Sequence, residues 1–318
     1  MPGHSTAVTY VKLLLTAVFW GGTFIAGRFV ARDVGPFSAA FLRFCIATFL
    51  LLAIARKAEG SLPPLNLRQA VSVLFLGMTG VFAYNAFFFR GLQDVEAGRA
   101  AVIIASNPIS ISLFSALIFR DRLSLAKMLG IVLSVAGAIV VVTRGDLGGV
   151  LSGGFGRGEL YIFCCVLSWT AYTLIGKDVM SRLSPLVSVT YSSLIGTTFL
   201  LVPAYLEGMP RQVTEYHWLD WVGISYLGIF GTVLGFYWFY QGVFHIGPVR
   251  ASQFINFVPI SAVILAFLIL HEPVTKSLLI GAGLVISGVY LAHAGSPKSP
   301  ADTKDVHPCG SSNKCIGR

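Results

Sequence analysis

One arginine stands inside an otherwise apolar run near the start of the chain. Arg43 lies in "FLRFCIATFLLLA", and the nearest charged residues are Asp33 and Arg56. Charged side chains at membrane depth are costly and usually functional. A guanidinium there could bind a carboxylate or phosphate, with two parallel hydrogen bonds where the geometry allows. The alternative is structural, because the long side chain could also reach the membrane interface or bond to a carbonyl.

Amide and aromatic side chains form the second group that could hold a small molecule. The amides can donate and accept hydrogen bonds, and their alternative role is to join helices. The aromatic rings could wall a cavity and stack on a ring or an apolar group, or anchor helices at the interface. The candidates are Asn85, Asn107, Gln241, Gln253 and Asn256, and Trp20, Tyr84, Trp169, Tyr172, Tyr191, Tyr237, Trp238 and Tyr240.

Two prolines stand at matching places in two apolar runs. Pro108 follows "ASN" and Pro259 follows "QFINFV", and we expect both in the middle of membrane helices. A proline there removes a backbone donor and frees a carbonyl, which protein or a watery cavity must satisfy. Each proline is therefore either a structural kink or part of a broken, gating helix that lines the substrate cavity.

The sequence offers no residues for catalysis or for a metal. No carboxylate falls in the middle of an apolar run, and the histidines lie near the ends of runs or in polar segments. The cysteines show no metal-ligand spacing. We therefore predict no catalytic residues, no metal and no cofactor, and a carboxylate-based proton relay is not supported. Facilitated diffusion, exchange and coupling through another group stay open.

The composition identifies the elements that must position these residues. Mean hydropathy is +0.77, and charged residues make up only 12% of the 318 residues, against about 25% in soluble domains. Apolar runs long enough to cross a bilayer follow one another and leave no room for a soluble catalytic domain. The net charge of +9 lies mainly in loops and tail, so it calls for no nucleic-acid partner.

Charges, prolines and glycines divide the chain into ten predicted spans. Residues 1–9 are expected to form a polar cytoplasmic N-terminus, 144–157 a Gly-rich linker and 295–318 a disordered cytoplasmic tail. A cleaved signal peptide is not expected. Lys and Arg are in excess on the side of the N-terminus, which predicts both termini in the cytoplasm. The predicted spans are 10–30, 36–56, 70–90, 97–119, 125–143, 158–178, 185–206, 218–243, 249–270 and 275–294.

The two halves of the chain are similar in sequence, which indicates an internal repeat. Without a gap, the first half aligns with the second so that Gly77 matches Gly228, Pro108 matches Pro259 and Asp121 matches Glu272. Five spans in each half force the second copy to enter the membrane from the opposite face. The predicted fold is therefore all-α and integral to the membrane, with two inverted five-helix repeats, 10–143 and 158–294, around a central cavity. Such repeats favour transport by alternating access.

These segments resemble the drug/metabolite transporter superfamily, in particular its ten-helix EamA-type members. The resemblance covers about residues 10–294 and rests on "FWGGTFIAGRFV…GPFSAAFLRF", "GLQDVEAGRAAVIIASNPI" and two copies of an acidic turn followed by a Gly-rich helix. It implies a central cavity lined by both repeats and export of small metabolites, typically amino acids or related compounds, across an inner membrane. The acidic turns at Asp121 and Glu272 are interpreted as structural.

The leading prediction is thus a secondary transporter of small organic metabolites such as amino acids, and not an enzyme. The alternatives are a flippase or carrier of lipid-linked or sugar-type substrates, a channel, and a membrane-embedded enzyme, which would need clustered acids, histidines or a metal. The expected partners are a small-molecule substrate and the lipid bilayer. The sequence leaves the oligomeric state open, and a monomer is compatible with it.

Overall fold

The protein is described by a computed structural model over residues 6–60, 62–119, 125–143, 145, 156–179, 182–246 and 254–294. Within these ranges the chain forms helices and turns and no strand, which confirms the all-helical class. The predicted tail, nearly all of the predicted linker, Gln253 and Asp121 lie outside the described residues.

The helices of residues 6–142 follow the predicted spans closely. Each of the first three predicted spans lies inside a longer helical segment, and the third segment contains a π-helical stretch. The elements are α1 (Thr6–Asp33), α2 (Pro36–Glu59), α3 (Leu67–Leu76), the π-helix η1 (Gly77–Ala83), α4 (Tyr84–Asp94), α5 (Ala97–Ile104), α6 (Asn107–Phe119) and α7 (Leu125–Val142).

The helices of residues 157–294 follow the same plan, again with a π-helical stretch in the third segment. The elements are α9 (Arg157–Val179), α10 (Pro185–Leu206), the short α11 (Met209–Gln212), α12 (Trp218–Tyr226), the π-helix η2 (Leu227–Leu234), α13 (Gly235–Ile246), the 3₁₀ turn η3 (Phe254–Asn256), α15 (Phe257–Leu270) and α16 (Lys276–Ala294).

Six of the described helices are long and apolar enough to cross a membrane, judged by length and composition. Three shorter apolar helices accompany them: Met128–Val141, Phe257–Leu270 and Lys276–Gly288. The outer surface carries large apolar side chains, with Phe49 74% and Leu206 79% exposed. A lipid environment accepts such side chains without cost, whereas water does not.

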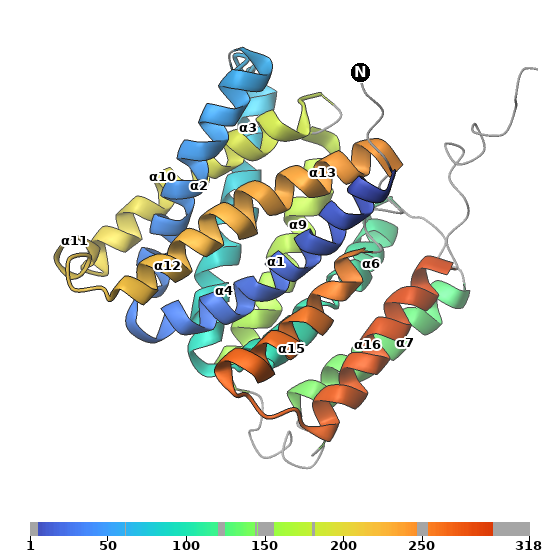
Figure 1. The fold of residues 1–318 in the computed structure, drawn as a ribbon. Helices are drawn as coiled ribbons and strands as arrows, with labels where there is room; N and C mark the ends of the chain where they lie inside the picture. The colour runs from blue at the N-terminus through green and yellow to red at the C-terminus, as the bar shows by residue number, and fades with distance from the viewer. Residues whose placement is uncertain are drawn as a thin grey trace, which may run out of the picture.

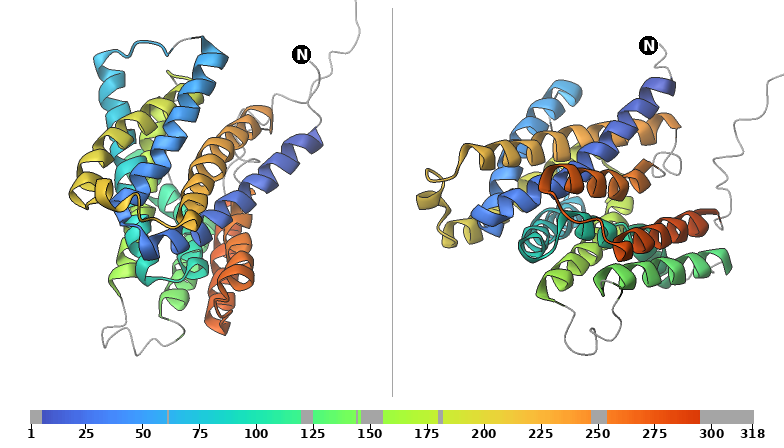
Figure 2. Two further views of the ribbon diagram at one scale, coloured as in Figure 1. Left: turned by 60° about the vertical axis from the view of Figure 1, so that its left-hand side comes forward. Right: turned by 60° about the horizontal axis from the view of Figure 1, so that its bottom comes forward.

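The helices form a bundle in which α1 lies along α13 and α15, and α2 lies along α10. The pair α7 and α16 lies side by side at one edge (Figures 1 and 2). The last turns of α1, α4, α10 and α15 and the first turns of α2, α5 and α12 meet at one end of the bundle, at the lower left of Figure 1. We call this the α11 end.

The expectation that Pro108 and Pro259 lie mid-helix is wrong. Turn residues Ala105 and Ser106 separate α5 from α6, so Pro108 is the second residue of a new helix. Pro259 likewise lies in the first turn of α15, directly after η3. A proline needs no N–H donor in a first helical turn and disfavours helix in the residue before it, so it starts a helix more readily than it kinks one.

Matched glycines bring the helices into close contact. A Cβ on Gly77 would lie 2.9 Å from the Ser192 carbonyl oxygen, and a Cβ on Gly228 would lie 2.9 Å from the Arg43 carbonyl oxygen. Gly77 lies in the π-helical stretch η1 and Gly228 in η2. Only hydrogen fits between backbones at these distances, so the two contacts set how closely α10 and α2 approach η1 and η2.

The pair α7 and α16 shows the same matching. A Cβ on Gly137 would lie 2.7 Å from the Gly281 carbonyl oxygen, and a Cβ on Gly288 would lie 2.6 Å from that of Gly130. Gly283, on the same helix as Gly288, has nothing within 4 Å of its Cβ position. The close backbone contact is therefore confined to one face of α16.

Candidate substrate-binding site

Arg43 lies in the interior, where it joins elements from distant parts of the chain. Its side chain is only 7% exposed. From α2 it donates one hydrogen bond to Asn85 Oδ1 in α4, at 2.9 Å, and two to Thr232 Oγ1 in η2, at 3.2 and 3.3 Å. The Arg43 side chain therefore stays in the interior and does not extend to the membrane interface.

The two partners of Arg43 are themselves held in place by the backbone. Asn85 Nδ2 donates to the Val81 carbonyl at 2.8 Å, which leaves its Oδ1 to face Arg43. Thr232 Oγ1 donates to the Leu227 carbonyl, five residues earlier, at 3.0 Å. Val81 lies in η1 and Thr232 in η2, and π-helical turns often occur at functional sites.

The positive charge of Arg43 has no counter-charge within the described residues. Among the described residues, the ion pair is that of Arg99 with Glu159, whose side chains are 3.2 Å apart at the α11 end, away from Arg43. Neutral acceptors satisfy some of the N–H groups of Arg43 but leave its charge in a poorly solvated interior, which is costly. An anion brought to this position would offset that cost.

Aromatic rings from several helices surround the same region. Trp169 in α9 has its ring centroid 5.5 Å from Tyr84, 5.3 Å from Tyr172 and 6.0 Å from Phe236. Phe236 also lies 5.7 Å from Trp20, whose indole N–H donates to the Gly231 carbonyl at 3.0 Å. Tyr84 lies close enough to Arg43 for the two side chains to interact electrostatically, and Trp20 bonds to the carbonyl of the residue before Thr232. These rings therefore adjoin the Arg43 cluster, and we call the rings the aromatic lining.

Four further candidates make contacts of their own. Tyr191 donates to the Pro63 carbonyl at 2.8 Å, and Gln241 accepts from Lys12 at 3.0 Å. Trp238 packs on Phe19, with centroids 5.6 Å apart. Tyr237 is 40% exposed. The structure therefore assembles Arg43, Tyr84, Asn85, Trp169 and Tyr172, and Tyr191 packs against the same apolar cluster as Trp169 and Tyr172.

Three amide candidates lie near the helix breaks. Asn107 opens α6, and its Oδ1 is buried without a hydrogen-bond partner. Nearby on α6, Ser110 Oγ accepts from Thr170 Oγ1 of α9 at 2.9 Å. Asn256 ends η3, and Gln253 precedes it outside the described residues. The break between α5 and α6 thus brings polar groups beside α9, next to Trp169.

Thr232 and Phe236 were not predicted from the sequence. Threonine in "GIFGTVLGF" reads as a helix residue that bonds to its own backbone, and Phe236 is one of 24 phenylalanines. The available signal was the internal alignment, in which Thr232 stands where the first copy has Val81. A polar residue in only one copy of a repeat departs from the shared packing pattern.

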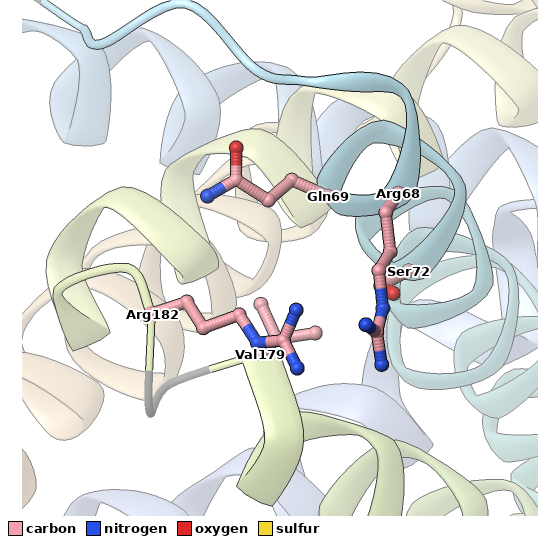
Figure 3. Close-up of a pocket in the computed structure, with 5 residues that line it drawn as sticks. All are labelled: Arg68, Gln69, Ser72, Val179 and Arg182. Carbon is pink, nitrogen blue, oxygen red and sulfur yellow. The ribbon is translucent and has the colours of Figure 1, made fainter.

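A surface hollow lies elsewhere and contains none of the predicted residues. Figure 3 shows it between the start of α3 and the end of α9, lined by Arg68, Gln69, Ser72, Val179 and Arg182. Its volume is about 200 Å³, including space open to solvent. Among the described residues, no group of three His, Cys, Asp or Glu side chains could hold a metal ion.

Comparison with known proteins identifies the family. The EamA-like transporter family matches residues 8–143 and, a second time, residues 156–293. The uncharacterized transporter YyaM of Bacillus subtilis is 31% identical over 283 residues, which cover 89% of this chain and 92% of that protein. An uncharacterized transporter of Archaeoglobus fulgidus is 28% identical over 284 residues, covering 89% and 97% of the two chains.

Two further relatives extend the comparison. A probable terminal-alkyne amino-acid exporter of Streptantibioticus cattleyicolor is 26% identical over 284 residues, covering 88% of this chain and 91% of that protein. A crystal structure of a protein with 19% identity superposes with a TM-score of 0.62, covering 90% of this chain and 98% of that one. At this identity the superposition supports the fold alone.

These relatives are transporters and not enzymes, in agreement with the sequence prediction. Together with the apolar helices, they identify a multi-pass membrane protein. The chain belongs to the EamA-like transporter family, within the drug/metabolite transporter superfamily.

Proposed function

We propose that the protein is a secondary transporter that exports small organic metabolites with a carboxylate or similar anionic group, amino acids among them. The observation that carries this proposal is the buried guanidinium of Arg43, held between Asn85 and Thr232 without a counter-charge among the described residues. The similarity to a probable amino-acid exporter supports the amino-acid class and the direction.

The aromatic lining gives the proposed substrate its second feature. The rings of Tyr84, Trp169, Phe236 and Trp20 continue from the Arg43 cluster and offer an apolar wall. A carboxylate on Arg43 would leave the rest of the molecule against these rings, where an apolar or aromatic side chain gains most. The proposed substrate is therefore amphipathic, with an anionic head and an apolar body.

Transport is proposed to occur by alternating access between two inverted five-helix repeats, ten spans in all. The proposed units are 10–143 and 158–294, joined by the linker 144–157, with the polar ends 1–9 and 295–318 in the cytoplasm. The double match to one family and the matched contacts of Gly77 with Gly228, and of Gly137 with Gly288, support this arrangement. The proposed location is the inner membrane.

The sites from both repeats lie on one chain, so a monomer is sufficient for the proposed cycle. The proposed site takes Arg43, Tyr84 and Asn85 from the first family match and Trp169, Thr232 and Phe236 from the second. A substrate held by groups from both repeats can be released to either side when the repeats rock against each other.

Flux measurements in proteoliposomes test the function. The purified protein is reconstituted, the vesicles are loaded with labelled amino acids, sugars or lipid-linked sugars, and counterflow is followed for each class. We expect exchange of amphipathic amino acids or related organic anions. Movement of lipid-linked or sugar-type substrates alone would favour the flippase alternative, and absence of any flux from a folded protein would contradict the proposal.

Thr232→Val tests the positioning of Arg43. The substitution removes the acceptor of two Arg43 N–H groups. Hydrogen bonds to charged groups contribute about 1.5–3 kcal/mol, so we expect KM for the transported anion to rise by roughly tenfold or more, with a smaller change in the maximal rate. Thr232→Ser keeps the hydroxyl and should transport nearly as the wild type does.

The control for this prediction is Thr198→Val, on the exposed face of α10. Thr198 bonds only to the Leu194 carbonyl of its own helix. Equal effects of the Thr198 and Thr232 substitutions on KM would show that the bond to Arg43 has no role in binding.

A further inference from the structure

Two helices of the first family match begin without a cap of their own. The N-cap of α2 is Gly35 and that of α5 is Glu96, and neither side chain caps its helix. By contrast, α3, α10 and α12 are capped locally by Asn66, Ser184 and His217. Uncapped first-turn N–H groups need an acceptor, and an anionic one also interacts favourably with the helix dipole.

Glu207, from the second family match, caps α2. Its Oε2 accepts from Ser38 N and Ser38 Oγ, both at 2.7 Å, and its Oε1 accepts from Phe37 N at 3.4 Å. A Cβ on Gly35 would lie 2.4 Å from the Glu207 carboxyl carbon, so any other residue here would force the carboxylate to shift from this position. The absence of a side chain at the N-cap is thus what admits the cap from the other repeat.

Glu272, also from the second family match, caps α5. Its two carboxylate oxygens accept from Ala97 N at 2.9 Å and Gly98 N at 3.1 Å. His271 has a φ of 54°, the left-handed conformation, and Glu272 N donates to the Ala266 carbonyl. The left-handed residue and this bond, whose two ends are six residues apart, end α15 and turn Glu272 toward α5. The acidic turn at Glu272 is interpreted from the sequence as structural, and the specific structural contact that Glu272 makes is this cap on α5.

The Glu207 cap joins the end of α10 to the start of α2, and the Glu272 cap joins the end of α15 to the start of α5, so both lie at the α11 end. Arg99 of the Arg99–Glu159 ion pair lies in the first turn of α5, at the same end. In each contact the acid comes from the second family match and the group that it binds from the first.

At the opposite end, Glu59 accepts a single bond, at 2.5 Å, from Ser184 Oγ, which already caps α10 itself. Lys12, near the start of α1, also bonds to Gln241 across the repeats at 3.0 Å. Among the described residues, the acids that cap a helix of the other repeat therefore lie at the α11 end.

We propose that Glu207 and Glu272 are latches that hold the transporter closed at the α11 end, and that both caps must release before this end opens. The inference rests on the alternating-access part of the proposed function. Opening would separate each carboxylate from its helix and leave first-turn N–H groups without an acceptor. Loss of one cap typically costs about 0.5–2 kcal/mol, which corresponds to a change of roughly two- to thirtyfold in the ratio of closed to open molecules.

Distance measurements test the latches without any substrate. Spin labels are attached at Gln93 and Thr275, two exposed positions at the α11 end, in the full chain with its native cysteines replaced, and the distance distribution is measured in nanodiscs. We expect Glu207→Ala and Glu272→Ala each to raise the long-distance population several-fold, and the double variant to raise it further. Glu272→Gln keeps one acceptor oxygen and should give an intermediate shift.

Matched controls separate latching from general loosening. Glu215→Ala removes an exposed carboxylate from the same end, and Glu59→Ala removes one that bonds at the opposite end; neither should raise the long-distance population. Gly35→Ala keeps the Glu207 carboxylate but displaces it, and should act like Glu207→Ala. It provides a second route should that variant fold poorly.

An unchanged distance distribution in the folded double variant would overturn the latch proposal. This outcome is distinguishable from failure of the proposed function, because the distances need no transported molecule. Shifted distances without flux of any metabolite would leave the latches standing and contradict the function. Flux of a metabolite together with an unchanged distance distribution would support the proposed function and contradict the latches.

Discussion

Arg43→Ala should reduce transport of an anionic or zwitterionic substrate by about thirtyfold or more. Truncating one partner of a buried, hydrogen-bonded charge pair costs about 2–5 kcal/mol, and each 1.4 kcal/mol is about tenfold. In this site the proposed partner is the substrate anion, because no carboxylate among the described residues pairs with Arg43. The measurement is counterflow in proteoliposomes with the anion identified by the flux screen.

Two further variants make this result specific. Arg43→Lys keeps the charge but loses the planar donor fork that reaches both Asn85 and Thr232, so it should restore only part of the rate. Arg90→Ala removes an exposed arginine stacked over Phe37, at 5.4 Å from the ring centroid, and should transport normally. Normal flux in a folded Arg43→Ala variant would exclude Arg43 from the substrate site.

Gly288→Leu should disrupt the packing of α16 on α7. The Cβ position of Gly288 lies 2.6 Å from both the Gly130 carbonyl oxygen and Ser134 N, and backbone atoms cannot move aside as a side-chain tip can. Overpacking a close contact costs about 1–3 kcal/mol or more. We expect a lower thermal unfolding temperature and a smaller yield of monodisperse protein in detergent.

Gly283→Leu is the matched control, on the same helix and with the same change in residue. Nothing lies within 4 Å of the Gly283 Cβ position. This variant should unfold at nearly the wild-type temperature, and leucine should slightly favour the helix over glycine. Similar losses in both variants would mean that the close approach of α7 and α16 contributes no stability.

The helices could be predicted from the sequence because membrane spans depend on local composition. Runs of about 20 apolar residues bounded by charges, prolines and glycines gave α2, α9 and α10 almost to the residue. The π-helical stretches η1 and η2 could not be found in this way. One extra residue in a helical turn does not change the hydropathy of the segment, so hydropathy cannot reveal a π-helical turn. Gly77 and Gly228 indicate only where two helices approach closely.

For the candidate site, the sequence singled out the charged residue but not the contacts that surround it. Arg43 stood out because a lone cation in an apolar run has a high cost, and Asn85 because a buried amide needs partners. Thr232 and the two latch acids act across more than 100 residues of sequence, so no local pattern reveals their partners. Pro108 was misplaced for a related reason, since a proline that starts a helix and one that kinks it look alike in one dimension.

The positions of the tryptophans give the protein a built-in optical reporter. Two of its five indoles, Trp20 and Trp169, belong to the aromatic lining next to Arg43, whereas Trp218 is 64% exposed at the α11 end. Emission from the first two depends on what occupies the space beside them, and quenching by a water-soluble agent selects the third. Ligand occupancy and surface background can thus be separated in one unlabelled sample.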